Sequence, residues 1–177
     1  GPGEASVPVA RRWTRSETIA TAPRVRVLVL DGASLGFIRQ RVAAGPLPNL
    51  ARLLDRGATM SMATLKPTEA EPVWASAATG TLPPKTGVRS NAIYRVEPGD
   101  APQVDLLPDY CFAYALVRQG FVGEDRQTTE SLTARAFWAI LADYGLSSGI
   151  TGWPMTYPAR AERGYIVTDR LDEAASS

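Results

Sequence analysis

The stretch RVRVLVLDG, residues 24–32, alternates between arginine and valine, then becomes continuously apolar, and ends at Asp31 and Gly32. An aliphatic, β-branched run of this kind is typical of a strand buried on both faces of a parallel sheet. An Asp-Gly pair is typical of the turn that ends such a strand. The stretch therefore predicts a central parallel strand whose carboxyl end carries Asp31.

Periodic apolar residues on its C-terminal side predict further elements. We expect helices over residues 35–45, 46–58, 71–80, 110–120 and 128–145, and strands over residues 59–65, 91–96, 147–153 and 165–169. The alternation predicts the α/β class, with a mostly parallel sheet and helices on both faces. Ligand sites in such sheets form at the carboxyl ends of strands. Asp31 and the loop at residues 66–70 should therefore meet at one edge.

The chain has 177 residues, enough for one domain with a hydrophobic core. We expect a flexible lead-in over residues 1–22, the domain over residues 23–172 and a polar tail over residues 173–177. The first residues, GPGEAS, are typical of the remnant of a cleaved tag. A natural signal or anchor could have been removed with it, so the cellular location stays open between bacterial cytoplasm, periplasm and exterior.

The charge balance excludes some partners. The net charge is +1, which argues against a nucleic acid polymer or an anionic membrane as the main partner. No apolar run reaches the length of about 20 residues that a membrane span needs. The chain has no histidine and one cysteine. Because catalytic zinc sites usually include histidine, a complete zinc site within this chain is not expected, while oxygen-only magnesium or calcium sites remain open.

Three residues are candidates for chemistry, each with a simpler alternative. Asp31 could hold a metal ion or only cap its own Asp-Gly turn. Thr68, in the loop before the helix at 71–80, could be a nucleophile once a metal or base activates it, or a turn or cap hydroxyl. Asn91, before the strand at 91–96, could donate to a phosphoryl oxygen or close a turn.

Several stretches taken together resemble the alkaline phosphatase superfamily, and within it the type I phosphodiesterase/nucleotide pyrophosphatase family. These stretches are RVLVLDG (26–32), PLPNLARLLDRGA (46–58), PTEAEPVWASAATGTLPPKTGVRSNAIY (67–94) and ITGWPMTYPARAERGYIVTDR (150–170). The resemblance implies an alkaline-phosphatase-like fold. It also implies a hydrolase of small-molecule phosphate esters, with in-line displacement at two metal ions, usually zinc. Asp31 matches a metal ligand of the family, and Asn91 matches its phosphoryl-binding asparagine.

The chain departs from the family pattern at the nucleophile. The family's Thr or Ser lies nine residues before the Thr of the TG pair, here Thr79, and this position holds Ala70. The nearest hydroxyl is that of Thr68, which is our candidate catalytic residue. Thr86 stands where the family often has histidine.

Members of the family are several hundred residues long, and their other metal ligands lie in the C-terminal half. The chain therefore resembles the N-terminal part of the fold only. We expect a truncated domain that is inactive by itself, and a homodimer formed through its exposed sheet edge.

Two other functions stay open. Ala70 favours a non-catalytic member of the fold that binds a phosphorylated ligand or a protein. The stretch PTEAEP has some likeness to the loop of phosphoethanolamine transferases, so a transferase remains an alternative. Sulfate ester hydrolysis is disfavoured, because sulfatases need Cys or Ser at the position of Ala70.

Overall fold

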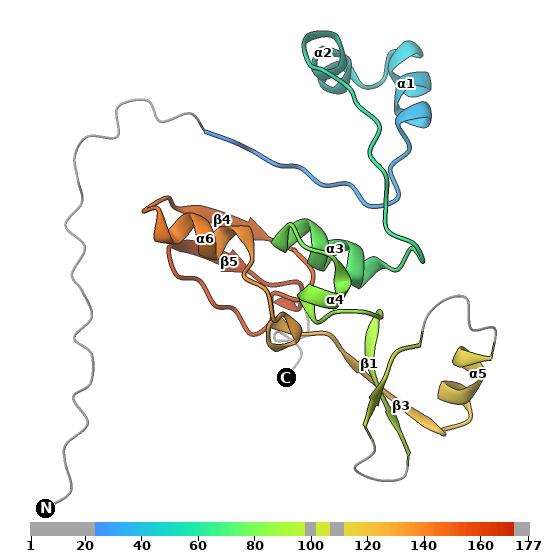
Figure 1. The fold of residues 1–177 in the computed structure, drawn as a ribbon. Coiled ribbons are helices and arrows are strands. Elements are labelled where there is room, and N and C mark those ends of the chain that lie inside the picture. The colour runs from blue at the N-terminus through green and yellow to red at the C-terminus, as the bar shows by residue number, and fades with distance from the viewer. Residues whose placement is uncertain (1–23, 98–101, 107–111, 172–177) are drawn as a thin grey trace, which may run out of the picture. The chain divides into compact units, whose positions relative to one another are not determined.

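The computed structural model describes residues 24–97, 102–106 and 112–171 (Figure 1). The chain divides into two compact units, Gly1–Met60 and Ser61–Ser177. The predicted lead-in and polar tail lie outside the described residues. Each unit is described by itself.

The first unit contains two packed helices, α1 (Leu35–Ala43) and α2 (Pro48–Arg56). Pro48 occupies the first position of α2, where a missing N–H costs nothing. Gly57 follows its last turn. Both helices confirm the predictions for residues 35–45 and 46–58.

The predicted strand at residues 24–30 is wrong. These residues form no ladder, and Val25, Val27 and Leu28 are 84%, 72% and 78% exposed. A strand needs a neighbour for its backbone hydrogen bonds, and residues 24–60, the described part of this unit, contain no strand. The predicted strand at residues 59–65 is also absent. The shared sheet edge expected for Asp31 and the loop at 66–70 is therefore not formed by these segments.

The second unit contains a three-stranded antiparallel sheet in the order β2-β1-β3. Its strands are β1 (Ala92–Val96), β2 (Gln103–Val104) and β3 (Val122–Arg126). β1 confirms the prediction for residues 91–96. β3 was not predicted, because three of the five residues in its sequence, VGEDR, are charged and no alternation of apolar and polar residues is visible. Helix α5 (Ala113–Arg118) packs against β3.

A separate two-stranded parallel sheet consists of β4 (Ser148–Thr151) and β5 (Gly164–Val167). Ile150 and Ile166 face each other in its register. Both strands confirm the predictions. The mixed α/β character is confirmed, but the mostly parallel sheet with helices on both faces is wrong. Among the described strands, only β4 and β5 pair in parallel. The connection from β1 to β2 is too short for a parallel crossover, so these strands pair antiparallel.

Helix α3 (Ala70–Thr79) and the single turn α4 (Pro83–Thr86) follow each other and pack together. α3 confirms the helix predicted at residues 71–80 and ends at Gly80, which has φ 68°. A small core beneath α3 is formed by Ala75, Val88 and Met155, with Trp74 and Leu132 packed against it.

The single helix predicted over residues 128–145 is wrong, because the segment divides. It forms a 3₁₀ turn η1 (Thr129–Ser131) and helix α6 (Phe137–Asp143). Thr128 and Ser131 cap the short turn reciprocally. The chain is then held extended, because Thr133 donates from its N–H to the Thr86 carbonyl at 2.9 Å and from its hydroxyl to the Lys85 carbonyl at 2.8 Å. Within the described ranges, no helix is long and apolar enough to cross a membrane.

Two helix-ending glycines predict different costs of substitution. Gly80 and Gly87 have φ of 68° and 85°, so an alanine at either position should cost about 1 kcal/mol of folding free energy. A Cβ at Gly80 meets nothing within 4 Å, whereas one at Gly87 meets the Ser131 carbonyl oxygen at 2.6 Å. Gly87→Ala should therefore cost about 3 kcal/mol or more in total, measured by urea unfolding. Equal losses for Gly80→Ala and Gly87→Ala would contradict this packing.

Candidate functional site

The loop at residues 66–69 leads directly into the N-terminus of α3. Glu69 is the last extended residue, with φ −115° and ψ 143°, and Ala70 is the first helical one. Pro72 lies in the first turn, where proline is tolerated because the N–H groups there have no partner within the helix. The remaining N–H groups of this turn carry partial positive charge, which favours anions.

Asn91 is tied to this helix end from outside the helix. The Glu71 N–H donates to the Asn91 Oδ1 at 3.2 Å, across 20 residues of sequence. The side chain of Asn91 thus satisfies one of the unpaired donors of α3. Because Oδ1 is engaged, the orientation of the amide group is set, and its Nδ2 has no hydrogen-bond partner among the described residues. Nδ2 can therefore donate to a ligand.

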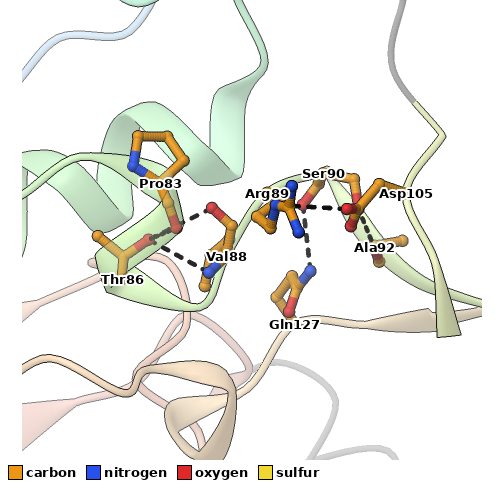
Figure 2. A network of polar contacts seen from close by, with 8 residues as sticks. All are labelled: Pro83, Thr86, Val88, Arg89, Ser90, Ala92, Asp105 and Gln127. Atoms are coloured by element: carbon orange, nitrogen blue, oxygen red, sulfur yellow. Dashed lines mark hydrogen bonds and ion pairs between the residues drawn. The ribbon is translucent and has the colours of Figure 1, made fainter.

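The backbone on both sides of Asn91 is fixed by buried hydrogen bonds (Figure 2). The Ser90 hydroxyl donates to the Ala92 carbonyl at 2.9 Å, and the Gln127 Nε2 donates to the Ser90 carbonyl at 3.1 Å. Ser90 is 0% and Gln127 5% exposed. These bonds couple Asn91 to the segment that follows β3.

Thr86, at the position where the family often has histidine, is fully buried and closes a turn. Its Oγ1 accepts from the Val88 N–H at 3.2 Å, and its hydroxyl lies within donating distance of the Pro83 carbonyl at 3.2 Å (Figure 2). A side chain with these partners stabilises the chain between α4 and β1. It is not available to a ligand in this conformation.

Thr68, the sequence-predicted nucleophile, lies exposed in the loop before α3. Its hydroxyl donates to the Leu65 carbonyl at 2.9 Å. This bond closes a local turn, which is the simpler role considered for Thr68. The structure therefore brings together Asn91 and the helix that the Thr68 loop enters, while the role of Thr68 as nucleophile stays a prediction.

Asp31, the sequence-predicted metal ligand, lies exposed in the first unit. It forms a turn with Gly32, which has φ 68°, and the turn is closed by a 3.4 Å bond from the Ala33 N–H to the Leu30 carbonyl. No group of three or more His, Cys, Asp or Glu side chains able to hold a metal occurs in the described part of the chain. The described residues therefore do not fit a complete zinc site.

Glu69 is the most unusual group at the helix start. It is 2% exposed, and neither carboxylate oxygen has a hydrogen-bond partner among the described residues. Burial raises the pKa of Glu69 above its ordinary value, and the main-chain N–H of Asn91 lowers it by less. A buried carboxyl without a partner favours its neutral form.

Glu71, in the first turn of α3, faces the end of β5. Burial raises its pKa first and repulsion by Asp169 second, while Arg126 and Arg170 lower it. Asp169 accepts from the N–H groups of Met155 and Thr156 at 3.2 and 3.3 Å. The N-terminus of α3 thus lies near the carboxyl end of the parallel pair β4–β5, the edge where α/β sheets form sites.

Sequence reasoning did not select Glu69, Glu71, Asp169 or Arg170 for the site. A usable signal existed for Asp169, because it follows the strand YIVT as Asp31 follows VLVL. Burial of Glu69 had no such signal, because a glutamate before a helix is normally solvated.

A cavity of about 190 Å³ lies elsewhere in the second unit, beside η1 and α6. Neither Thr68 nor Asn91 lines it. It is smaller than the pockets of about 300–1,000 Å³ that usually hold small ligands. The N-terminus of α3 therefore remains the better candidate site.

The buried carboxyl of Glu69 predicts a pH-dependent stability. Its pKa is raised in the folded chain above the ordinary 4.5, so the folded state binds more protons than the unfolded state between these two values. Stability should be full below the ordinary pKa and fall as pH rises through the raised one. Glu69→Gln should therefore stabilise the chain at pH 8 by more than about 0.5 kcal/mol, the size typical of a surface substitution, and change little at acidic pH.

Urea unfolding across pH measures this effect, and Glu130→Gln is the matched control. Glu130 is an exposed glutamate paired with Arg160, for which a change within about 0.5 kcal/mol is expected. Destabilisation by Glu69→Gln at pH 8 would contradict the assignment.

Comparison with known proteins identifies the family of the chain. The sequence model of the family described as Type I phosphodiesterase / nucleotide pyrophosphatase matches residues 25–175. Neither the comparison with curated proteins nor that with solved structures found a match. The matched range covers most of the 177 residues and includes the Thr68 loop, α3 and Asn91. The resemblance noted in the sequence is thereby confirmed, and the chain belongs to the type I phosphodiesterase/nucleotide pyrophosphatase family.

Proposed function

We propose that this chain is part of a phosphoric ester hydrolase that acts on a small-molecule phosphodiester or nucleotide. The observation that carries the proposal is the position of Asn91 at the N-terminus of α3. Its Oδ1 is bound to the Glu71 N–H at 3.2 Å, which leaves Nδ2 as a donor beside the first turn of the helix.

The helix start supplies what a phosphoryl anion needs. The N–H groups of a first turn point outward along the axis and carry partial positive charge. Asn91 Nδ2 adds a donor whose orientation is fixed before substrate binds. Donors fixed in advance stabilise charge that develops on the phosphoryl oxygens without reorganising during the reaction.

In the proposed reaction Thr68 is the nucleophile. Its Oγ1 attacks phosphorus in line with the leaving oxygen, so that an Oγ1–P bond forms as the P–O ester bond breaks. The hydroxyl proton passes from Oγ1 to solvent, and the leaving oxygen takes up a proton from solvent. The 2.9 Å bond from the Thr68 hydroxyl to the Leu65 carbonyl must open first. Water then cleaves the covalent intermediate.

Two metal ions, zinc in most members of the family, would activate the nucleophile and stabilise the charge of the displacement. We propose Asp31 as one ligand. The described residues do not fit a complete set, and the chain has no histidine. We propose that the remaining ligands are not among the described residues, and that the chain of 177 residues is inactive by itself.

A second candidate function is binding of a phosphorylated ligand without turnover. Two observations favour it. Ala70 occupies the position that matches the family's nucleophile. The Thr68 hydroxyl is engaged with the Leu65 carbonyl and is two residues from that position. Under this alternative, Asn91 and the helix start would still bind the phosphoryl group.

Removal of the Thr68 hydroxyl distinguishes the two functions. The test uses the longest natural reading frame, with zinc, against a chromogenic phosphodiester and a chromogenic phosphomonoester. Thr68→Ala should lower kcat by about three orders of magnitude or more, as expected for loss of a nucleophile. Thr64→Ala, which removes an exposed hydroxyl from the segment just before this loop, should leave kcat unchanged.

Full activity of the Thr68→Ala variant would contradict the role of Thr68. Tight binding of either ester without turnover by the unmodified protein would favour the second function.

We also propose that the chain forms a homodimer. The apolar segment at residues 25–30 is exposed and lacks a pairing strand within residues 24–60, so it could add to the same segment of another copy. Light scattering should give a mass of two chains at micromolar concentration. The mass of one chain across that range would exclude the dimer.

A further inference from the structure

The chemistry of Glu69 is not used in the proposed reaction, although Glu69 lies at the centre of the site. It directly precedes the first residue of α3, a helix of 10 residues, and is 2% exposed. Both of its carboxylate oxygens are buried and make no hydrogen bond of ordinary geometry with a described residue, although the main-chain N–H of Asn91 is near enough to lower its pKa somewhat. An unpaired buried charge is far more costly than an unpaired neutral group, so this arrangement suits a carboxyl that carries its proton.

One residue connects this carboxyl to the anion-binding donors. The main-chain N–H of Asn91 faces the Glu69 carboxyl, while the side chain of Asn91 accepts from the Glu71 N–H. Asn91 thus links the two groups: its main-chain N–H is near the Glu69 carboxyl, and its side chain carries the donor Nδ2. A negative charge on Glu69 would oppose any anion bound at Nδ2 and the helix start, and it would do so in surroundings of low dielectric constant.

We propose that binding of a phosphoryl anion at the N-terminus of α3 is linked to protonation of Glu69, so that the anion binds tightly only while this carboxyl is neutral. This inference rests on the proposed function, because the anion is the phosphoryl group of the substrate. Glu69 is a positioning residue in this account. It acts on the ligand through Asn91 and through the local field, and makes no contact with the phosphoryl group.

The neighbouring charges do not offset an ionised Glu69. Tyr94 on β1 has a pKa of about 12, raised first by burial and then by Glu124, Tyr114 and Glu69, so it is neutral near pH 7. No lysine or arginine of the described residues is among the groups that shift the pKa of Glu69. By contrast, Arg126 and Arg170 lower the pKa of the adjacent Glu71 and balance part of its charge. The pKa of Glu71 is raised as well, but its charge is partly balanced, so we assign the proton linked to the anion to Glu69.

Linkage fixes the direction of the effect. The raised pKa of Glu69 should rise further when the anion is bound, so binding takes up a proton at pH values between these two pKa values. Affinity should be highest at acidic pH and fall as pH rises. Coupling between two sites of this kind commonly changes affinity by about 5- to 150-fold.

Isothermal titration calorimetry of the 177-residue chain with diphenyl phosphate tests the inference. This phosphodiester keeps a single negative charge while Glu69 titrates, so the ligand contributes no proton of its own. Each titration is made in two buffers of different ionisation enthalpy, and the difference between them gives the number of protons taken up. The experiment compares the unmodified chain with Glu69→Gln and with Glu130→Gln, which removes an exposed glutamate.

The unmodified chain should take up about half a proton or more per anion at pH values between the two pKa values of Glu69, and its affinity should fall about tenfold or more with rising pH. The Glu69→Gln variant should bind without proton uptake. Its affinity should be the same at all pH values and equal to the affinity that the unmodified chain has at acidic pH. Glu130→Gln should behave as the unmodified chain does.

Three results would overturn the inference. Binding by the unmodified chain with an affinity that is constant across pH and with no proton uptake would overturn this inference and leave the proposed phosphoryl site in place. This result needs no variant. Loss of binding in a Glu69→Gln chain with an unchanged circular dichroism spectrum would show that the carboxyl itself is needed. Absence of binding at every pH, in the unmodified chain and in Glu69→Gln alike, would overturn the phosphoryl site of the proposed function and this inference with it.

Discussion

The hydrogen bond from the Glu71 N–H to the Asn91 Oδ1 is the interaction on which the site depends. It joins the start of α3 to the start of β1, two elements that pack into different small cores. It satisfies a helix donor and at the same time orients the amide of Asn91. Without it, the position of Asn91 relative to the loop that carries Thr68 would not be fixed. Asn91 is the residue that matches the phosphoryl-binding asparagine of the family.

Buried polar groups support this bond from both sides. Ser90 and Gln127 fix the backbone next to Asn91, and Thr86 closes the turn before it. Each of these side chains is buried with its hydrogen bonds made, which is the condition under which polar groups rigidify a structure at little cost. Glu69 differs from them, because it is equally buried and its carboxylate oxygens make no hydrogen bond that meets the usual geometry with a described residue. Glu71 Oε2 is also buried without a partner among the described residues, but Glu71 is near Arg126 and Arg170. The lack of a nearby cation at Glu69 within the described ranges is the reason to assign it a proton and a role in binding.

The sequence predicted the elements that depend on local signals and missed those that depend on distant partners. Helix α3 was predictable from its small apolar residues and Gly80, and β4 and β5 from their aliphatic runs. The segment at residues 24–30 has an equally strong strand signal but no neighbouring strand within residues 24–60, so apolar pattern alone did not make it a strand. Of the site, Asn91 was predicted from the resemblance, whereas burial of Glu69 and the approach of Asp169 to Glu71 arise from packing between segments far apart in sequence.

Hydrogen exchange at the Glu71 amide reports on the bond to Asn91 without any assumption about the ligand. The N–H groups of a helix's first turn normally lack a partner and exchange fast. We expect the Glu71 N–H to be protected in the unmodified chain. Asn91→Ala should remove this protection while amides in the middle of α3 stay protected. Fast exchange of the Glu71 N–H in the unmodified chain would contradict the bond to Asn91, and with it the proposed orientation of the phosphoryl-binding amide.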